Sequence, residues 1–305
     1  MNVLFMGTPD FAVPTLKKLA ESGHNIKAVI TQPDKPVGRK QVLTPPDVKV
    51  CAEQLGLKVL QPETLRNDNS IKEIKELDPD VIVVVAYGKI LPKAILDIPK
   101  YGCVNVHGSL LPKYRGAAPI QQAVLNGDKV TGVTTMYMGE GLDTGDILLT
   151  SETEIGENET SAELFDRLSE LGADLLIKTL EGLEKGVITP VKQDEAQATY
   201  TVKITKAMCP IDWNKPALEI HNQVRGLQTW PVAVSKLNGK DIKIHKTLLC
   251  DKSGKAGEII STEPLTVACG EKSVVIKELQ LSGKKRMDSK TFLLGHPLSV
   301  GDSFE

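Results

Sequence analysis

The segment Val81–Tyr87, VIVVVAY, decides the fold class of this 305-residue chain. Every residue in it is hydrophobic, so a strand formed by it would be buried on both faces, as the strands of parallel sheets are. It is too short for the roughly 18 apolar residues of a membrane span. A helical pattern that ends before Pro79 precedes it, and the next strand-like run is GCVNVHG (102–108). Doubly buried strands that alternate with helices predict an α/β fold with a mostly parallel, doubly wound sheet.

The same alternation continues in both directions from this strand. Strand-like runs include NVLFMG (2–7), NIKAVIT (25–31), TGVTTMYM (131–138) and ILLTSETEI (147–155), and a long helical pattern covers 161–185. Beyond it the pattern changes to one helix and then to short strands separated by turn signals. We therefore predict a Rossmann-like domain over 1–188, a polar linker over 189–205, and a smaller antiparallel, OB-like β-barrel domain over 206–305.

Composition and charge limit the classes of function. The chain is 41% hydrophobic and 25% charged, which is ordinary for a globular protein, and its first residues lack the basic region of a signal peptide. Its five cysteines are scattered and never spaced as CxxC, which argues against a disulfide framework and is typical of the reducing cytoplasm. Lys and Arg exceed Asp and Glu from Lys206 onward, whereas acidic residues exceed basic ones before it. This asymmetry fits either a polyanionic partner held by the C-terminal domain or an ordinary solvated surface.

Two polar residues stand at the end of the strand predicted over 102–108. Residues i and i+2 of a strand share a face, so Asn105 and His107 should point into one crevice. In doubly wound sheets ligands bind at the carboxyl ends of strands, at a topological switch point, and we expect the pair to lie there. Asp143 follows the next strand within the glycine-rich stretch MGEGLDTGDILLT (138–150), where it could join them.

An amide, an imidazole and a carboxylate suit acyl transfer without a covalent intermediate. The Asn105 side-chain N–H can stabilise an oxygen that gains charge, and His107 can accept the proton of an attacking amine. Asp143 can orient the imidazole or relay its proton through water. The sequence has no GxSxG motif, so Ser109 is not predicted to be a nucleophile. A turn-forming Asn and a hydrogen-bonded His remain the structural alternative for the pair.

Four segments resemble one enzyme family. NVHGSLLPKYRGAAPIQQAVLNGD (105–128) and GLDTGDIL (141–148) are similar to the folate-dependent formyltransferases. MGTPDFAVPTLKKL (6–19) and TQPDKPVGRKQ (31–41) are similar to those members of the family that act on a methionyl-tRNA. The resemblance covers essentially the whole chain, including a C-terminal domain that the shorter glycinamide ribonucleotide enzymes lack.

This resemblance implies a formyl transfer from 10-formyltetrahydrofolate to the α-amino group of methionine on initiator tRNA, for translation initiation. By motif, Asn105, His107 and Asp143 would be the catalytic trio. Asn105 and His107 would hold the oxyanion of a tetrahedral intermediate, and Asp143 would assist proton removal. The folate-binding segment would consist of Ser109, Leu110, Leu111 and Pro112.

The same resemblance assigns tRNA contacts to one basic segment, and charge clustering predicts them for a second. The segment 31–46 is too long and polar for a tight turn between strand and helix, and the resemblance places it beside the acceptor stem. Lys35, Arg39 and Lys40 would contact phosphates or base edges there. In the C-terminal domain, GKKRMDSK (283–290) supplies Lys284, Lys285 and Arg286 for phosphate contacts that weaken with salt. A solvated loop and a solvated turn are the alternatives.

Competing functions are distinguished by features of the sequence. A folate enzyme that formylates a nucleotide sugar or a purine precursor would not need the long basic loop or the basic domain. A nicotinamide dehydrogenase would carry GxGxxG after the first strand, where this chain has GTPDFA. A tRNA-binding module with a vestigial site is disfavoured by the intact trio. No histidines have metal-ligand spacing with nearby acids, so we predict no metal, and we expect a cytoplasmic monomer without a membrane partner.

Overall fold

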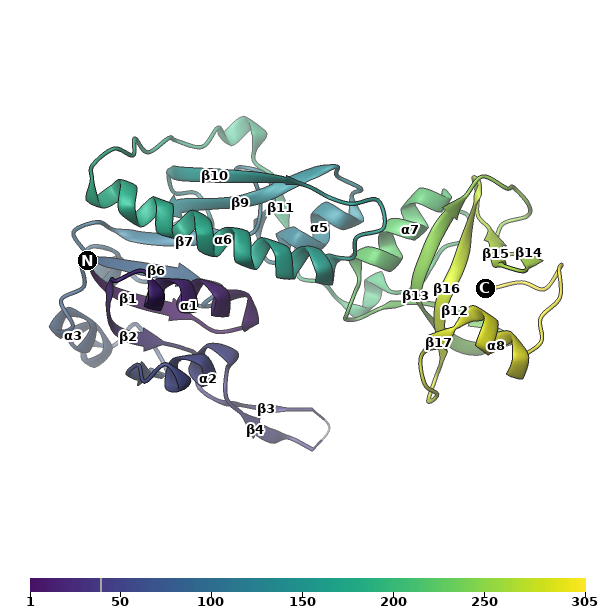
Figure 1. Cartoon of the computed structure of the whole chain (residues 1–305), viewed down its shortest axis with the longest axis horizontal. Helices are drawn as coiled ribbons and strands as arrows, with labels where there is room; N and C mark the ends of the chain where they lie inside the picture. The colour runs from purple at the N-terminus through teal and green to yellow at the C-terminus, as the bar shows by residue number, and fades with distance from the viewer. Residues whose placement is uncertain (39) are drawn as a thin grey trace. The chain divides into compact units, whose positions relative to one another are not determined.

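The computed structural model describes residues 1–38 and 40–305, which divide into two compact units (Figure 1). Unit 1 consists of Met1–Gly116, Thr131–Thr153 and Phe165–Tyr200. Unit 2 consists of Ala117–Val130, Glu154–Leu164 and Thr201–Glu305. Two short segments from within the predicted catalytic domain, 1–188, therefore belong to unit 2. The domain limits at 188 and 206 stay predictions.

Unit 1 is built on a seven-stranded sheet of order β10-β9-β7-β6-β1-β2-β5. Pairing is parallel from β7 through β6, β1 and β2 to β5, whereas β9 runs antiparallel to β7. The mostly parallel, Rossmann-like sheet is thus confirmed. Its strands are β1 (Asn2–Gly7), β2 (Asn25–Ile30), β5 (Val59–Leu60), β6 (Val81–Val85), β7 (Cys103–His107), β9 (Val130–Tyr137) and β10 (Ile147–Glu154).

Helices cover the two faces of this sheet, because its central strands are apolar on both sides. All five residues of β6 are buried. Leu4, Ile82 and Cys103 belong to one core cluster with side chains of α3 and α4, whereas Gly172 of α6 packs against Val106. The helices are η1 (Asp10–Ala12), α1 (Val13–Glu21), α2 (Asp47–Gln54), α3 (Asp68–Glu76), α4 (Lys93–Leu96) and α6 (Ser161–Glu184). Because β7 alternates, its odd-numbered residues face the α3 and α4 side.

The strand order reverses between β1 and β6, which corrects the predicted position of the site. β7 lies one strand away from this switch point, so Asn105 and His107 are at a carboxyl end but not at the switch itself. The switch is closed by hydrogen bonds, since Thr8 Oγ1 and Gln32 Nε2 both donate to the Tyr87 carbonyl oxygen, at 3.0 and 2.9 Å. Strand order is decided by which strands pair in the folded chain, and the hydrophobic pattern of a single segment does not indicate its neighbours in the sheet.

The segment 31–46 is more ordered than a solvated loop. β3 (Lys35–Val37) and β4 (Val42–Thr44) pair as an antiparallel hairpin whose six strand residues are all exposed. At its base, Lys49 Nζ lies 2.9 Å from both carboxylate oxygens of Asp34, and Gln61 Nε2 donates to Asp34 Oδ1 at 2.8 Å. The hydrogen bonds from Gln61 and Lys49 lower the pKa of Asp34. The base of the hairpin is therefore held by a charged cluster.

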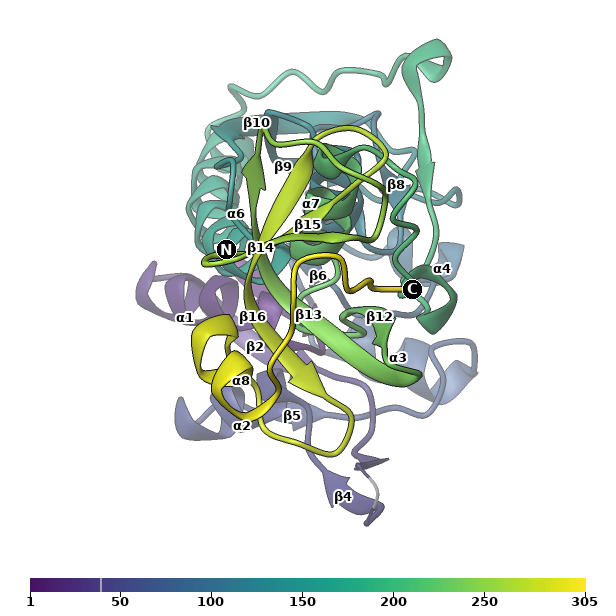
Figure 2. The same cartoon turned by 90° about the vertical axis from the view of Figure 1, so that its right-hand side faces the viewer.

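Unit 2 contains a sheet of order β12-β13-β16-β15-β14, with β17 on β16. Residues after α8 pair with both outer strands. Lys236 N and Glu305 O are 3.0 Å apart, and Ile259 N and Asp302 O are 2.7 Å apart, so the C-terminal segment closes the predicted barrel (Figure 2). The elements are α5 (Pro119–Leu125), η3 (Lys206–Met208), α7 (Ala217–Gly226), β12 (Ala233–Leu237), β13 (Lys240–Cys250), β14 (Ile259–Thr262), β15 (Leu265–Ala268), β16 (Ser273–Leu281), β17 (Met287–Asp288) and α8 (Ser289–Gly295).

Two further observations bear on the class of protein. Across residues 1–38 and 40–305, no helix combines the length and the apolar character that crossing a membrane requires. All five cysteines are free thiols, and four of them are buried.

Candidate functional site

His107 is the last residue of β7 and is 7% exposed. Its Nε2 lies 2.9 Å from the carbonyl oxygen of Tyr114. A carbonyl oxygen can only accept a hydrogen bond, so Nε2 carries the proton. In the neutral ring Nδ1 is therefore the nitrogen with a lone pair. It faces Asp143, with 3.8 Å between Nδ1 and Oδ2.

Asp143 reaches the imidazole from the loop between β9 and β10. Its Oδ2 accepts a hydrogen bond of 2.7 Å from the backbone N–H of Gly116, and its backbone has a φ of 53°. This left-handed conformation is uncommon for a residue other than glycine. Gly145 allows the loop to lie against β9, because a Cβ there would collide with the Tyr137 carbonyl oxygen. The loop thus delivers the carboxylate at the cost of a strained backbone.

Asn105 lies two residues before His107 on the same face of β7 and is 9% exposed. Among the described residues, none forms a hydrogen bond with its side-chain amide, although buried amides are normally paired. An unpaired N–H donor beside a histidine lone pair and a carboxylate can stabilise charge on an oxygen while a proton moves to the ring. The structure brings the three predicted catalytic residues to one end of the sheet.

The four predicted folate-binding residues follow β7 directly. Ser109 is fully buried, and its Oγ donates to the Lys113 carbonyl oxygen at 2.7 Å. Thr134 Oγ1 donates to the Ser109 carbonyl oxygen at 2.7 Å and accepts from Leu111 N at 3.1 Å. Leu110 and Pro112 are half-buried. The segment is therefore fixed by its own hydrogen bonds, and the Ser109 hydroxyl is used within the loop.

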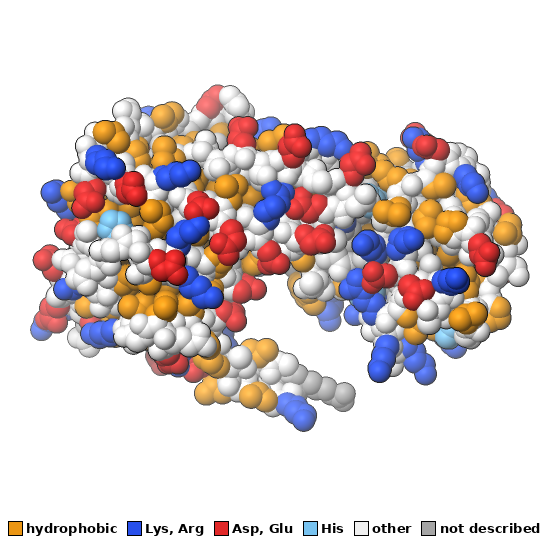
Figure 3. Space-filling view, viewed as in Figure 1, with side chains coloured by type: hydrophobic (Ala, Val, Ile, Leu, Met, Phe, Trp, Pro, Cys, Tyr) orange, Lys and Arg blue, Asp and Glu red, His pale blue; other side chains and the backbone are white. Residues whose placement is uncertain are grey.

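The predicted tRNA contacts lie in both units. Lys35 and Lys40 are exposed on the hairpin of unit 1, and Lys35 Nζ donates to Gln32 Oε1 at 2.5 Å. Arg39 lies outside the described residues. Lys284, Lys285 and Arg286 are exposed in unit 2 between β16 and β17, and Figure 3 shows Lys and Arg side chains in this region. Arg286 Nε pairs with Glu278 Oε2 at 2.6 Å, so part of its charge is neutralised.

Several residues around the trio were missed by the sequence analysis. Tyr114 and Gly116 contribute only backbone atoms, for which side-chain identity gives no signal. Arg115 is fully buried and bonds to Gln193 and Glu195, at 2.7–3.0 Å. Gln193 and Glu195 lie in the predicted linker. No sequence signal indicated these contacts, because nothing in the sequence shows that Arg115 is buried and therefore requires acceptors.

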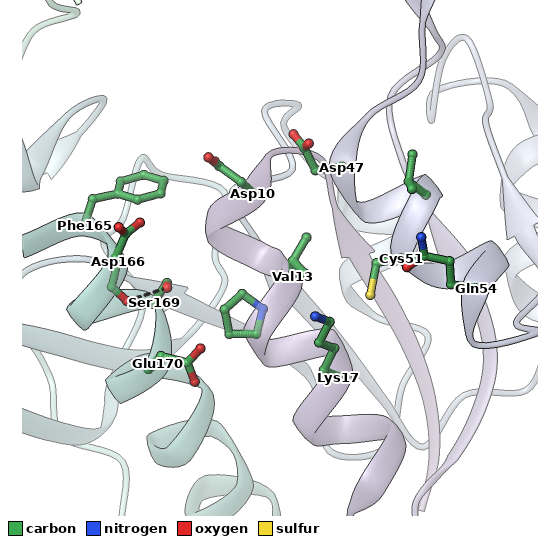
Figure 4. Close-up of a pocket in the computed structure, with 12 residues that line it drawn as sticks. Asp10, Val13, Lys17, Asp47, Cys51, Gln54, Phe165, Asp166, Ser169 and Glu170 are labelled. Carbon is green, nitrogen blue, oxygen red and sulfur yellow. Dashed lines mark hydrogen bonds between the residues drawn. The ribbon is translucent and has the colours of Figure 1, made fainter. Parts of the chain in front are cut away.

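A cavity of about 510 Å³ lies between α1, α2 and α6 (Figure 4). It is lined in part by Asp10, Lys17, Asp47 and Asp166. Desolvation by burial raises the pKa of Asp10, with Asp47 and Asp166 adding repulsion. Because α6 packs on the face of Val106, this cavity and the trio are on opposite faces of the sheet. Within the part of the chain that the structure describes, no group of His, Cys, Asp and Glu side chains could hold a metal ion.

Comparisons with protein families match nearly the whole chain. The family described as formyl transferase matches residues 1–180, and the formyl transferase C-terminal domain matches residues 203–297. A methionyl-tRNA formyltransferase of Citrifermentans bemidjiense is 53% identical over 99% of this chain and 95% of the relative. A methionyl-tRNA formyltransferase of Lachnospira eligens is 50% identical over 99% of this chain and 98% of the relative.

Solved structures with the same fold are more distant in sequence. An N-formyltransferase from Helicobacter canadensis, in complex with folinic acid and dTDP-3-aminofucose, has a TM-score of 0.70 and 21% identity, over 90% of this chain and 99% of that chain. HypX from Aquifex aeolicus, in complex with tetrahydrofolic acid, has a TM-score of 0.66 and 17% identity, over 100% of this chain and 50% of that chain. At these identities the likeness establishes the fold alone.

Proposed function

Because this chain belongs to the formyl transferase family, among its methionyl-tRNA formyltransferases, we propose that it formylates the α-amino group of methionine on initiator tRNA. The family resemblance that the sequence motifs carry is confirmed by relatives about half identical over nearly its full length. The geometric observation that supports formyl transfer is the Asn105 amide on the same face of β7 as His107, whose Nδ1 faces Asp143 Oδ2 at 3.8 Å.

The proposed formyl donor is 10-formyltetrahydrofolate, which supplies an electrophilic one-carbon acyl group when it is bound. Structural neighbours in complex with folinic acid or tetrahydrofolic acid support a folate as the donor. The Asn105 amide fits such a group, because it is a donor in a largely buried residue and has no acceptor among the described residues. The segment Ser109–Pro112 would hold the folate through its half-buried residues and its backbone, since the Ser109 hydroxyl already bonds to Lys113.

Each residue of the trio then has a separate role in the proposed mechanism. Asn105 donates its side-chain N–H to the formyl oxygen as that oxygen gains charge. His107 Nδ1 accepts the proton of the attacking amine while Nε2–H stays bonded to Tyr114. Once protonated, Nδ1 is a donor that can also stabilise the oxygen, and Asp143 stabilises the positive ring. Transfer would be completed when the bond between the formyl carbon and the folate nitrogen breaks and Nδ1 gives its proton to that leaving nitrogen, which restores the neutral ring.

A formyl-transfer assay tests this proposal directly. With 10-formyltetrahydrofolate as the donor, we expect formylation of charged methionyl initiator tRNA and none of free methionine. The comparison acceptors are a nucleotide-linked amino sugar and a purine precursor amine. Formylation of either of these, without activity on the charged tRNA, would assign the chain to a different acceptor, and binding of tRNA without any transfer would favour the module with a vestigial site.

The remaining proposals concern partners and location. We propose that the β3–β4 hairpin, through Lys35, Arg39 and Lys40, and the β16–β17 turn both contact the tRNA. We also propose that the enzyme acts as a monomer in the cytoplasm, where charged initiator tRNA is used for translation initiation.

Replacing Lys284, Lys285 and Arg286 by Ala should weaken binding to every tRNA and reduce its salt dependence. Each lost phosphate contact lowers the slope of log K against log salt by about 0.7–0.9. Because Arg286 is paired with Glu278, we expect the slope to fall by about two such contacts rather than three. The measurement is tRNA binding at several salt concentrations.

The control removes two positive charges, Lys252 and Lys255, which are exposed in another turn of unit 2 and match in number the two contacts that the triple variant is expected to lose. It should change the slope less than the triple variant does. If the slope of log K against log salt is the same for the triple variant and the wild type, the β16–β17 turn does not contribute to tRNA binding.

A further inference from the structure

Residues 191–200 form a strap along unit 1, although their composition is that of a linker. Val191 and Ile147 exchange two backbone hydrogen bonds of 2.8 Å each. Near its other end, β11 (Tyr200–Thr201) pairs with β8 (Arg115–Gly116). Between these anchors the strap contacts the two loops that complete the catalytic trio.

The first of these contacts holds the loop of Asp143. Gln193 Nε2 donates to the carbonyl oxygens of Asp143 and Gly145, at 2.8 Å each. The first of these bonds is made to Asp143 itself, the residue whose φ is 53°. A residue other than glycine persists in such a conformation only where its surroundings fix it, at a cost of about 1–3 kcal/mol. Gln193 supplies that fixation from outside the loop.

The second contact holds the loop that sets the protonation of His107. Tyr114 has a φ of 61°, and its carbonyl oxygen accepts from His107 Nε2. Thr199 Oγ1 accepts from Tyr114 N, and the Thr199 carbonyl oxygen accepts from Arg115 N, at 2.8 Å each. Thr199 N also donates to the Pro112 carbonyl oxygen at 3.2 Å. The strap therefore fixes a second left-handed residue, and this one carries the acceptor of the imidazole proton.

Arg115 joins the two contacts into one network. Its guanidinium donates to Gln193 Oε1 through Nε and Nη2, at 3.0 and 2.8 Å, and binds Glu195 in a bidentate pair of 2.7 and 2.9 Å. Its Nη1 also donates to Tyr200 Oη at 3.1 Å. The bidentate pair with Glu195 raises the pKa of Arg115. A guanidinium without exposed surface thus stays charged and orients the Gln193 amide, so that its N–H groups face the Asp143 loop.

We propose that the strap 191–200 is a positioning element of the active site, in which Gln193 orients Asp143 and Thr199 orients His107 through Tyr114. This inference rests on the proposed function. Neither residue contacts the reacting atoms in it, and each acts through a backbone group that the trio requires. Along the chain, the strap is the last segment of unit 1, and its hydrogen bonds are made with other residues of unit 1.

The test begins with Gln193→Met, which keeps the length of the side chain and removes the amide. Displacing a catalytic group by about 1 Å costs up to roughly 10²-fold in rate, so we expect kcat to fall by about 10–100-fold. The KM for the charged tRNA should remain within about twofold, since substrate contacts are retained. The matched control is Gln197→Met, because Gln197 is exposed and bonds only to Asp194 of the strap itself among the described residues. It should keep the wild-type kcat.

A double-mutant cycle distinguishes positioning from a general structural effect. In an Asp143→Asn background, Gln193→Met should lower kcat by less than about twofold, because the carboxylate that Gln193 positions is already absent. Full multiplication of the two effects would overturn the proposal, as would an unchanged kcat for Gln193→Met alone.

A readout without catalysis separates this proposal from the proposed function. The Gly116 amide bonds to Asp143 Oδ2, so its hydrogen exchange reports the position of the carboxylate. We expect exchange of this amide to accelerate by about tenfold in Gln193→Met and to stay unchanged in Gln197→Met. If the wild type formylates no acceptor, the proposed function is wrong. If hydrogen exchange of the Gly116 amide is unchanged in Gln193→Met, the positioning role of the strap is wrong, whatever the outcome for the function.

Thr199 provides a second pair of variants, in case Gln193→Met folds poorly. Thr199→Val removes the acceptor of Tyr114 N without changing the shape of the side chain, and it should lower kcat by about tenfold. Thr199→Ser keeps the acceptor oxygen and should recover most of that loss. If kcat falls equally in Thr199→Val and Thr199→Ser, the position requires packing rather than this hydrogen bond, and the proposed role of Thr199 is wrong.

Discussion

Asp143→Asn is expected to lower kcat for formylation by about 10²–10⁴-fold, the range associated with a lost acid–base group. The change removes the negative charge that faces His107 Nδ1 at 3.8 Å. It keeps a side-chain oxygen that can accept from Gly116 N, the bond of 2.7 Å that fixes the carboxylate. The loop should therefore keep its position while the protonated imidazole loses its counter-charge.

The measurement is single-turnover formylation of charged tRNA together with binding of the folate. We expect folate affinity close to that of the wild type, since the segment after β7 is untouched. Asp146→Asn is the matched control, because Asp146 lies in the same loop and its side chain bonds to no other described residue. A kcat within threefold of wild type for Asp143→Asn would remove Asp143 from the mechanism.

Asn105→Leu should separate activity from stability. We expect kcat to fall by about 10²–10³-fold, as it does when one donor to a developing oxyanion is lost. The free energy of unfolding should stay equal or rise. The Asn105 amide has no partner among the described residues, and its atoms are not among the fully buried unpaired ones, so the replacement removes no hydrogen bond of the folded chain. Thermal unfolding and single-turnover rates measure the two effects.

Thr135→Val is the contrasting control, because Thr135 is buried and its hydroxyl is paired. Thr135 Oγ1 lies 2.8 Å from Thr179 Oγ1, so the variant should lose about 0.5–1.5 kcal/mol of stability while keeping its rate. If Asn105→Leu instead lost stability and kept its rate, the amide would be a structural group and the oxyanion role would be falsified.

The sheet and the trio could be predicted because both depend on side-chain patterns. The uninterrupted apolar run of β6 requires burial on both faces, and the i, i+2 spacing of Asn105 and His107 places them on one face. The strand order could not be predicted from the sequence, since it is decided by pairing between segments that are far apart along the chain. The pairing of β3 with β4 is not predictable from the pattern, because both strands are exposed and burial leaves no alternation in them.

The environment of the trio could not be predicted for a different reason. The His107 partner is a backbone carbonyl of Tyr114, and the Asp143 partner is a backbone N–H of Gly116. Such contacts place no demand on the identity of the side chain. Gln193 and Thr199 act through hydrogen bonds in a polar, aperiodic stretch, and such a composition is also that of a solvated linker.

The closure of the barrel by residues 301–305 has a consequence for biosynthesis. The strands from β12 to β17 emerge from the ribosome first. Val234 of β12 already pairs with Cys209 and Ile211, but among the described residues the Lys236 end of β12 and the outer edge of β14 pair only with residues 301–305. Phe304, 4% exposed in the folded domain, follows the other residues of its buried core cluster along the chain. Until residues 301–305 have left the ribosome, the nascent domain therefore exposes the edge of β14 and part of the edge of β12, a state prone to pairing with other chains.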